Sequence, residues 1–232
     1  MRSIRFALAA AAMIASTAIA SPAAPRNNAE YTTLAAPQPT QAVGQKVEVI
    51  EFFAYHCPAC NVMEPHVAQW KKKHENDVTF RRIAFPFKGA TDPEVHLWLT
   101  LDAMGKAEEV GPKVFRAFHV ERQRLNNDQQ IMEWVGKSSG LDKAKFTEMW
   151  NSFGVLTKMK RMPALVAAYK VDGTPSFVVD GRYVTSPSTI GAANPALGNQ
   201  LPEATKTTLD AMVAMVLKQK AAAAPVKAAP KK

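Results

Sequence analysis

The sequence predicts an α/β protein, in which a mixed central sheet flanked by helices is interrupted by an inserted all-helical domain. Three observations predict this arrangement. Residues 46–90 contain a strand, a helix and a second strand, and residues 91–168 show helical patterns only. Residues 169–219 then return to a hairpin followed by a helix. A strand–helix–strand unit gives parallel strands and a hairpin gives antiparallel ones, so the predicted sheet is mixed.

The first twenty residues have the pattern of an export signal. A short positive segment, 1–5, precedes an apolar, alanine-rich run, 6–20, that ends in the small-x-small sequence Ala18-Ile19-Ala20. This run is shorter than the ~20 residues that a membrane-spanning helix needs. We expect an exported protein cut after Ala20, with an uncleaved membrane anchor as the alternative. Residues 21–45 are rich in Ala, Pro, Asn, Gln and Thr without a period, which predicts a flexible N-terminal arm.

The first part of the sheet domain is expected over residues 46–90. Residues 47–55 are β-rich with apolar side chains at both alternating sets of positions, which is typical of a strand covered on both faces. Apolar residues at helical spacing then follow Cys60, and three lysines, 71–73, end the helix where its dipole favours cations. Residues 78–85 are predicted to form a second strand.

The inserted domain begins with a clear helix start. Asp92 is a favourable N-cap, and Pro93 fits the first helical turn. Asp128 and Asp142 open two later helices in the same way. Beyond this first helix, we expect helices at 107–121, 128–138, 142–153 and about 155–170.

The second part of the sheet domain is predicted from a turn signal. Asp180-Gly181 separates two β-rich runs, and an Asp-Gly pair in this position favours a hairpin. The segments expected after the hairpin are a loop (186–200), an amphipathic helix (about 202–219) and a disordered Lys/Ala/Pro tail (220–232).

The charge distribution argues against a nucleic-acid-binding protein. The formal net charge is +9. Arg2 and Arg5 lie in the export signal, and five lysines without any acid lie in the last fifteen residues. Without these seven cations the body of the chain is close to +2, so no basic binding face is expected.

Cys57 and Cys60 are the only cysteines, and they lie where the first strand meets its helix. A disulfide across two residues would be a weak staple, worth about 2 kcal/mol. Redox chemistry suits the position better, because free N–H groups and the helix dipole stabilise a thiolate at Cys57. Pro58 fits the first turn, and Cys60 lies one turn further in. A stabilised thiolate favours the dithiol and makes the disulfide more oxidising.

The cysteine pair has two other interpretations. A zinc site would need two more ligands, for which His56, His66 and His74 are the nearby candidates. The sequence contains no second cysteine pair and no spaced histidine pair, so no metal is expected. An inert structural pair is the remaining alternative.

Two motifs carry a family resemblance. The segment EFFAYHCPAC, 51–60, and the distant segment GTPSFVVDG, 173–181, stand in an order that resembles the DsbA-like periplasmic thiol:disulfide oxidases. The likeness covers roughly residues 45–220. It implies a thioredoxin fold interrupted by a helical domain, and it implies location in the periplasm.

The resemblance also implies roles for individual residues. Cys57 matches the attacking cysteine and Cys60 the resolving cysteine. Glu51 matches an acidic residue that the family buries behind the disulfide. Desolvation there is expected to raise the pKa of Glu51 and to suit it to proton exchange with Cys60. The alternative is that Glu51 lies at a solvated strand edge or in an ion pair. Pro175 matches a cis-proline that faces the disulfide. Thr174 is expected to pair with an extended client peptide through its backbone.

The motif departs from the family at one position. The family commonly has histidine as the second residue between the cysteines, where this chain has Ala59. We therefore predict a weaker oxidant than the strong members of the family. His56, directly before Cys57, either compensates as a thiolate-tuning residue together with Pro58 and Ala59, or is an ordinary surface histidine.

The predicted function is the introduction of disulfides into reduced exported proteins, with no cofactor beyond the cysteine pair. The resemblance implies reduced client proteins as substrates and a DsbB-type quinone-linked membrane oxidase as the partner that regenerates the disulfide. A monomer is expected, because residues 21–45 are too short to be a dimerisation domain. The alternatives are a disulfide reductase or isomerase and, from another class, a peptide-binding chaperone with incidental cysteines.

Overall fold

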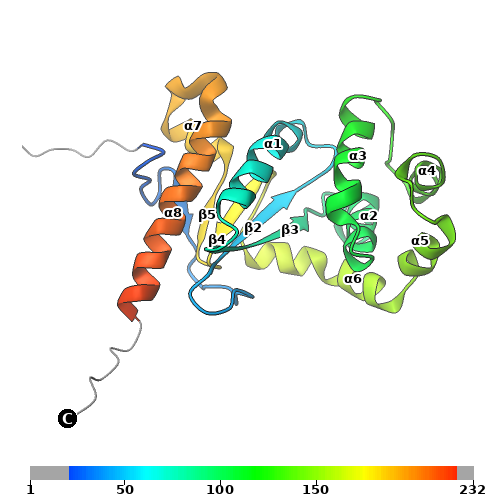
Figure 1. The fold of residues 1–232 in the computed structure, drawn as a ribbon, viewed down its shortest axis with the longest axis horizontal. Helices are drawn as coiled ribbons and strands as arrows, with labels where there is room; N and C mark the ends of the chain where they lie inside the picture. Colours follow the sequence, from blue (N-terminus) through cyan, green and yellow to red (C-terminus); the bar gives the residue numbers. More distant parts are fainter. Residues whose placement is uncertain (1–20, 224–232) are drawn as a thin grey trace, which may run out of the picture.

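A five-stranded mixed sheet forms the centre of the computed structural model, which describes residues 21–223 (Figure 1). The predicted export signal, 1–20, and the end of the predicted tail lie outside the described residues. The strand order is β1-β5-β4-β2-β3, with β2 parallel to β3 and antiparallel to β4. The strands are β1 (Tyr31–Thr33), β2 (Val47–Phe53), β3 (Val78–Ala84), β4 (Ser176–Val179) and β5 (Tyr183–Thr185).

Helices cover the sheet and extend beyond the β3 edge. In Figure 1, α1 and α8 cross the sheet side by side, while α2 to α5 gather on the side of the molecule away from α8. The helices are α1 (Pro58–Lys73), α2 (Pro93–Ala103), α3 (Ala107–His119), α4 (Asp128–Trp134), α5 (Lys143–Trp150), α6 (Phe153–Ala168), α7 (Pro187–Ala193) and α8 (Leu201–Ala223). Shorter helical turns are η1 (Gly89–Thr91), η2 (Val135–Ser139) and η3 (Pro195–Gln200).

Strand β2 connects the two hydrophobic clusters of the molecule. All seven of its residues are buried. Successive side chains of a strand point to opposite faces. Val47 and Val49 therefore pack with Trp70 in the cluster under α1 and α8, whereas Ile50 and Phe52 join the cluster formed with the inserted helices. The apolar pattern on both parities of this segment thus has the structural basis that we expected.

The predicted strands, hairpin and helical insertion are all present. Asp180 and Gly181 have φ values of 53° and 63°, as a tight hairpin turn between β4 and β5 requires. A Cβ on Gly181 would lie only 2.1 Å from the carbonyl oxygen of Gln38, so this position excludes any side chain for two independent reasons.

The N-terminal segment differs from the prediction of a flexible arm. Tyr31–Thr33 forms strand β1 and pairs antiparallel with β5. The carboxylate of Glu30 is buried and accepts hydrogen bonds from the backbone of Arg26 at 2.9 Å and from the side chain of Asn194 at 3.0 Å. The segment is ordered because long-range contacts hold it, and a three-residue strand among prolines leaves no periodic signal.

Two further boundaries differ from the predictions. The predicted loop at 186–200 contains the short helix α7, whose N-cap is Ser186. Helix α8 runs to Ala223, beyond the predicted end at 219, because alanine and lysine propagate a helix well.

Candidate active site

The two cysteines lie at the junction between β2 and α1, as predicted. Cys57 is the N-cap of α1, and its sulfur accepts a 3.3 Å hydrogen bond from the backbone N–H of Cys60. Both cysteines are buried and both are free thiols, so the structure represents the dithiol form. In this form the Cys57 thiol also lies 3.4 Å from the carbonyl oxygen of Thr174, to which it donates.

The surroundings of Cys57 favour its thiolate. A hydrogen bond from the Cys60 thiol is the largest cause, and it lowers the pKa of Cys57 to about 5. Burial opposes this effect, while the Thr174 side chain and the backbone N–H groups of Ala59 and Cys60 support it. These donors belong to the helix N-terminus and to the neighbouring loop. A low thiol pKa therefore arises here without a histidine between the cysteines.

The same hydrogen bond acts in the opposite direction on Cys60. Donation to Cys57 raises the pKa of Cys60 above its ordinary value, and burial raises it further. Cys60 thus stays protonated while Cys57 is ionised. Cys57 is thus suited to act as nucleophile and leaving group, and Cys60 keeps its proton.

The loop before β4 lies against Cys57. The Thr174–Pro175 peptide bond is cis, the isomer that the resemblance implied for Pro175. Ser176 donates a 2.7 Å hydrogen bond to the carbonyl oxygen of Gly173, which closes the loop on itself. The start of α1 and the Thr174–Pro175 loop, more than a hundred residues apart in sequence, therefore both contact the Cys57 sulfur.

Glu51 lies in a buried charge cluster below the cysteines. Its side chain is fully buried, and its Oε2 accepts a 2.8 Å hydrogen bond from Nε of Arg82 on β3. Arg82 also donates to Glu64 of α1 at 2.6 and 3.3 Å. Burial raises the pKa of Glu64; Arg82 opposes this and Glu51 adds to it. The structure combines the burial that we expected for Glu51 with the ion pair that was the alternative.

His56 is bound to the inserted domain. Its Nδ1 lies 2.7 Å from Oε1 of Glu94 on α2, and its backbone N–H donates to the other carboxylate oxygen at 3.1 Å. The hydrogen bond with Glu94 raises the pKa of His56; burial opposes this, and the negative charge of Cys57 adds to it. His56 is therefore a paired histidine whose positive form is favoured close to Cys57, and its role as a thiolate-tuning residue stays a prediction.

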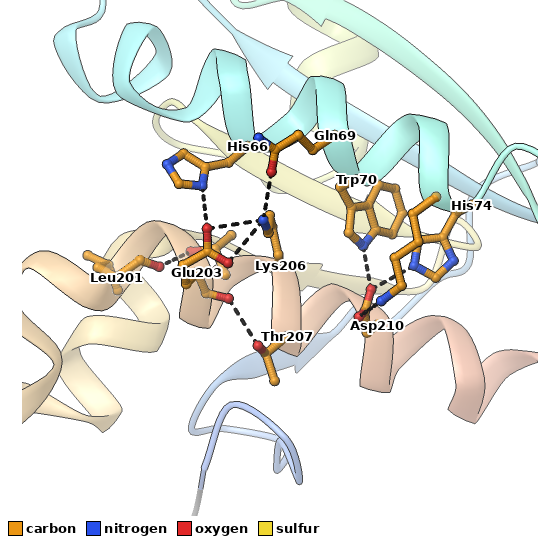
Figure 2. A network of polar contacts seen from close by, with 11 residues as sticks. His66, Gln69, Trp70, His74, Leu201, Glu203, Lys206, Thr207 and Asp210 are labelled. Carbon is orange, nitrogen blue, oxygen red and sulfur yellow. Dashed lines mark hydrogen bonds and ion pairs between the residues drawn. The ribbon is translucent and has the colours of Figure 1, made fainter.

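Helix α1 is fixed against α8 by polar contacts along its length. Asp210 of α8 accepts 2.7 Å hydrogen bonds from Trp70 Nε1 and His74 Nε2, and it also pairs with Lys73 (Figure 2). Burial disfavours ionisation of Asp210, but these three donors hold its pKa below the ordinary value. The other α1–α8 contacts in Figure 2 come from His66, Gln69, Glu203 and Lys206. The helix that presents Cys57 is thus held along its far end by its neighbour.

The histidines considered as zinc ligands are engaged elsewhere. His66 pairs with Glu203 at 2.9 Å, and His74 pairs with Asp210. Within residues 21–223, no group of three or more His, Cys, Asp or Glu side chains is arranged to hold a metal ion.

Sequence reasoning missed three charged residues of this site. Arg82 is the direct partner of Glu51 in the parallel β2–β3 register, so a correct strand alignment would have found it. Glu64 lies four residues after Cys60, on the same face of a helix. Glu94 is 38 residues from His56, and no local pattern connects the two.

Comparisons with known proteins agree with this geometry. A family model described as thioredoxin matches residues 42–198. The thiol:disulfide interchange protein DsbA of Bordetella parapertussis is 40% identical over 79% of this chain and 87% of its own length. The DsbA of Burkholderia cepacia is 36% identical over 90% of this chain and 93% of its own.

Solved structures give the same result. The crystal structure of Pseudomonas aeruginosa DsbA has a TM-score of 0.72 and 33% identity, covering 84% of this chain and 94% of that one. The oxidoreductase NmDsbA1 of N. meningitidis has a TM-score of 0.71 and 26% identity, covering 87% and 98% respectively.

Proposed function

This chain belongs to the DsbA family of thiol:disulfide interchange proteins, and from that premise we propose how its own residues oxidise a client. It is a protein thiol:disulfide oxidoreductase with a thioredoxin fold and an inserted helical domain. Its Cys57–Cys60 pair introduces disulfides into reduced proteins. The observation that carries the assignment is the thiolate-stabilising position of Cys57 at the start of α1, next to the Thr174–Pro175 loop.

The reaction begins with the oxidised pair. A client thiolate attacks the Cys57 sulfur, a client–Cys57 disulfide forms, and the Cys57–Cys60 bond breaks with Cys60 leaving as a thiolate. The second client thiolate then attacks the client sulfur of the mixed disulfide and releases Cys57 as a thiolate. Two electrons pass from the client to the enzyme pair. The pKa of about 5 makes Cys57 a good leaving group in this second step.

Glu51 is proposed as the group that exchanges the proton of Cys60. The leaving Cys60 thiolate must gain a proton, because its pKa lies above the ordinary value. Glu51 and Glu64 place two carboxylates around the single guanidinium of Arg82, so one acidic proton can be held there without losing charge balance. Oε1 of Glu51 is buried and has no hydrogen-bond partner within residues 21–223, which leaves it open to a proton.

Thr174 and Pro175 are proposed to bind the client backbone, and His56, Pro58 and Ala59 to tune the thiolate. The contact between Cys57 and the Thr174 carbonyl supports the first part, because a client cysteine joined to Cys57 would lie beside that backbone. The Glu94-bound His56 supports the second part.

The family also suggests a compartment and partners. We propose a periplasmic monomer, released by cleavage after Ala20, whose substrates are reduced proteins and whose pair is reoxidised by a DsbB-type membrane oxidase. No helix within residues 21–223 has the length and apolarity to cross a membrane. The domain division at 46–90, 91–168 and 169–219 is part of the same proposal.

The test is oxidative refolding of a reduced two-disulfide client by the purified mature protein. We expect Cys57→Ala and Cys60→Ser each to abolish the activity, because neither variant can form the disulfide that oxidises the client. Full activity of Cys57→Ala would support the chaperone alternative instead. The equilibrium with glutathione separates the enzyme classes, because a potential near −270 mV, as in thioredoxin, would indicate a reductase.

A further inference from the structure

A groove at the edge of the sheet is lined by neither cysteine, and Arg82 is the one residue that it shares with the charge cluster around Glu51. It lies between β3, α2, α6 and the start of α3, and its volume is about 750 Å³. Small-molecule sites commonly have volumes of ~300–1,000 Å³ and mostly apolar walls. The apolar walls here are supplied by Phe80, Trp98, Leu99, Met162 and Leu165.

Two of the arginines on its wall are already neutralised. Arg81 donates to the fully buried Glu48 at 3.0 Å, and Arg82 is held by Glu51. Glu108, an acid on the same wall, is likewise paired with Lys71 at 2.8 Å. These groups therefore contribute little net charge to a bound molecule.

Two further cations on the lining are only partly compensated by acids. Lys158 and Arg161 project from α6, which contains no acidic residue between its ends. Of the two acids on the lining, Glu108 is paired with Lys71, and Asp102 lies 4.0 Å from Lys158. Within residues 21–223 the Arg161 side chain has no hydrogen bond or ion pair. Two cations and one carboxylate give a net charge of +1, which one anionic head group would neutralise.

We propose that this groove binds an amphipathic monoanion, an alkyl carboxylate whose head pairs with Arg161 and Lys158 and whose chain lies along Phe80, Trp98 and Leu165. The positive charge of the lining requires a negatively charged head group, and the apolar walls require an apolar chain. An extended peptide added to β3 fits less well, because Ile83 and Ala84 at the end of this edge strand are buried against the rest of the protein.

The probe is decanoate, titrated calorimetrically into the mature protein and followed by tryptophan fluorescence, to which Trp98 contributes. Decanol supplies the same chain without the charge, and butyrate supplies the charge without the long chain. We expect saturable one-to-one binding of decanoate that weakens at high salt, at least tenfold weaker binding of decanol, and no measurable binding of butyrate.

Matched variants separate the head-group site from general surface charge. Arg161→Gln should weaken decanoate binding about tenfold, the value of one lost charge-assisted hydrogen bond. Arg124→Gln removes an exposed arginine outside the groove and should change the affinity for decanoate less than twofold. Leu165→Ser should weaken binding, whereas Leu156→Ser, a leucine equally exposed on the same helix but outside the lining, should not.

Several results would overturn the assignment. Non-saturable decanoate binding, decanol binding as tight as decanoate binding, or equal losses for the Arg161 and Arg124 variants would each do so. Saturable binding of an acidic peptide that decanoate fails to displace would assign the groove to a peptide instead. Unchanged circular dichroism and unchanged Cys57 alkylation in each variant show that folding does not account for a loss.

Discussion

Removing the Cys60 thiol tests what makes Cys57 acidic. In the dithiol form the Cys60 S–H hydrogen bond is the largest cause of the low Cys57 pKa, ahead of Thr174 and the backbone N–H groups. We expect Cys60→Ala to raise that pKa substantially. Cys60→Ser keeps a hydroxyl donor in the same place and should preserve most of the effect.

The size of the effect follows from the strength of a charged hydrogen bond. Such a bond contributes about 1.5–3 kcal/mol, and each pKa unit corresponds to about 1.36 kcal/mol. From a starting value of about 5, Cys60→Ala should therefore reach a pKa of about 6–7. At pH 5 the thiolate fraction then falls from about one half to a tenth or less.

The assay is the rate of iodoacetamide alkylation of Cys57 between pH 3.5 and 9, read by mass spectrometry, because only the thiolate reacts. The pH at which the alkylation rate reaches half its maximum should be about 1–2 units higher in Cys60→Ala than in wild type. Identical titration curves for wild type and Cys60→Ala would refute the reasoning and assign the low pKa to the backbone N–H groups and Thr174.

Three further outcomes follow from other parts of the structure. In the reverse, reductive direction, Cys60 must lose its proton before it resolves the mixed disulfide between Cys57 and the client. Glu51→Gln should therefore lengthen the lifetime of that mixed disulfide about 100-fold in stopped-flow measurements, while the alkylation rate of Cys57 barely changes. Equal lifetimes would exclude proton exchange through Glu51. Asp210→Asn should lower the free energy of unfolding in urea by about 1–3 kcal/mol at pH 7. The pKa of Asp210 is lower in the folded protein than in the unfolded chain. Its contribution to the free energy of unfolding is therefore present above the unfolded pKa and should disappear as the pH falls below about 4. A difference between wild type and Asp210→Asn that does not depend on pH would contradict the ion-pair assignment. Gly181→Ala should cost more stability than Gly44→Ala, since both glycines have positive φ but only Gly181 faces the Gln38 carbonyl; equal losses would show that the backbone conformation alone matters.

The departure at Ala59 has a specific consequence in this structure. The prediction of a weakened oxidant was based on the missing histidine between the cysteines. The structure stabilises the Cys57 thiolate through other donors and adds a paired His56 nearby. Whether the potential falls below that of the strong family members stays a prediction, and the glutathione equilibrium described above measures it.

Much of the fold was determined by local sequence patterns. The apolar run of β2, the Asp180-Gly181 turn and the aspartate caps of α2 and α5 are short-range signals, and each appears in the structure where the sequence predicts it. The position of Cys57 at a helix N-terminus is of the same kind, because the strand ends and the helix begins within a few residues.

Only the tertiary structure decided the remainder, since these features join residues that are distant in the chain. Strand β1 exists through its pairing with β5, and the ion pair of Glu51 through the β2–β3 register. The bond between His56 and Glu94 spans 38 residues, and the groove beside Arg161 is formed by a strand and helices from separate parts of the chain. A propensity acts over one or two turns of backbone, whereas a buried charge finds its partner only when packing brings the two together.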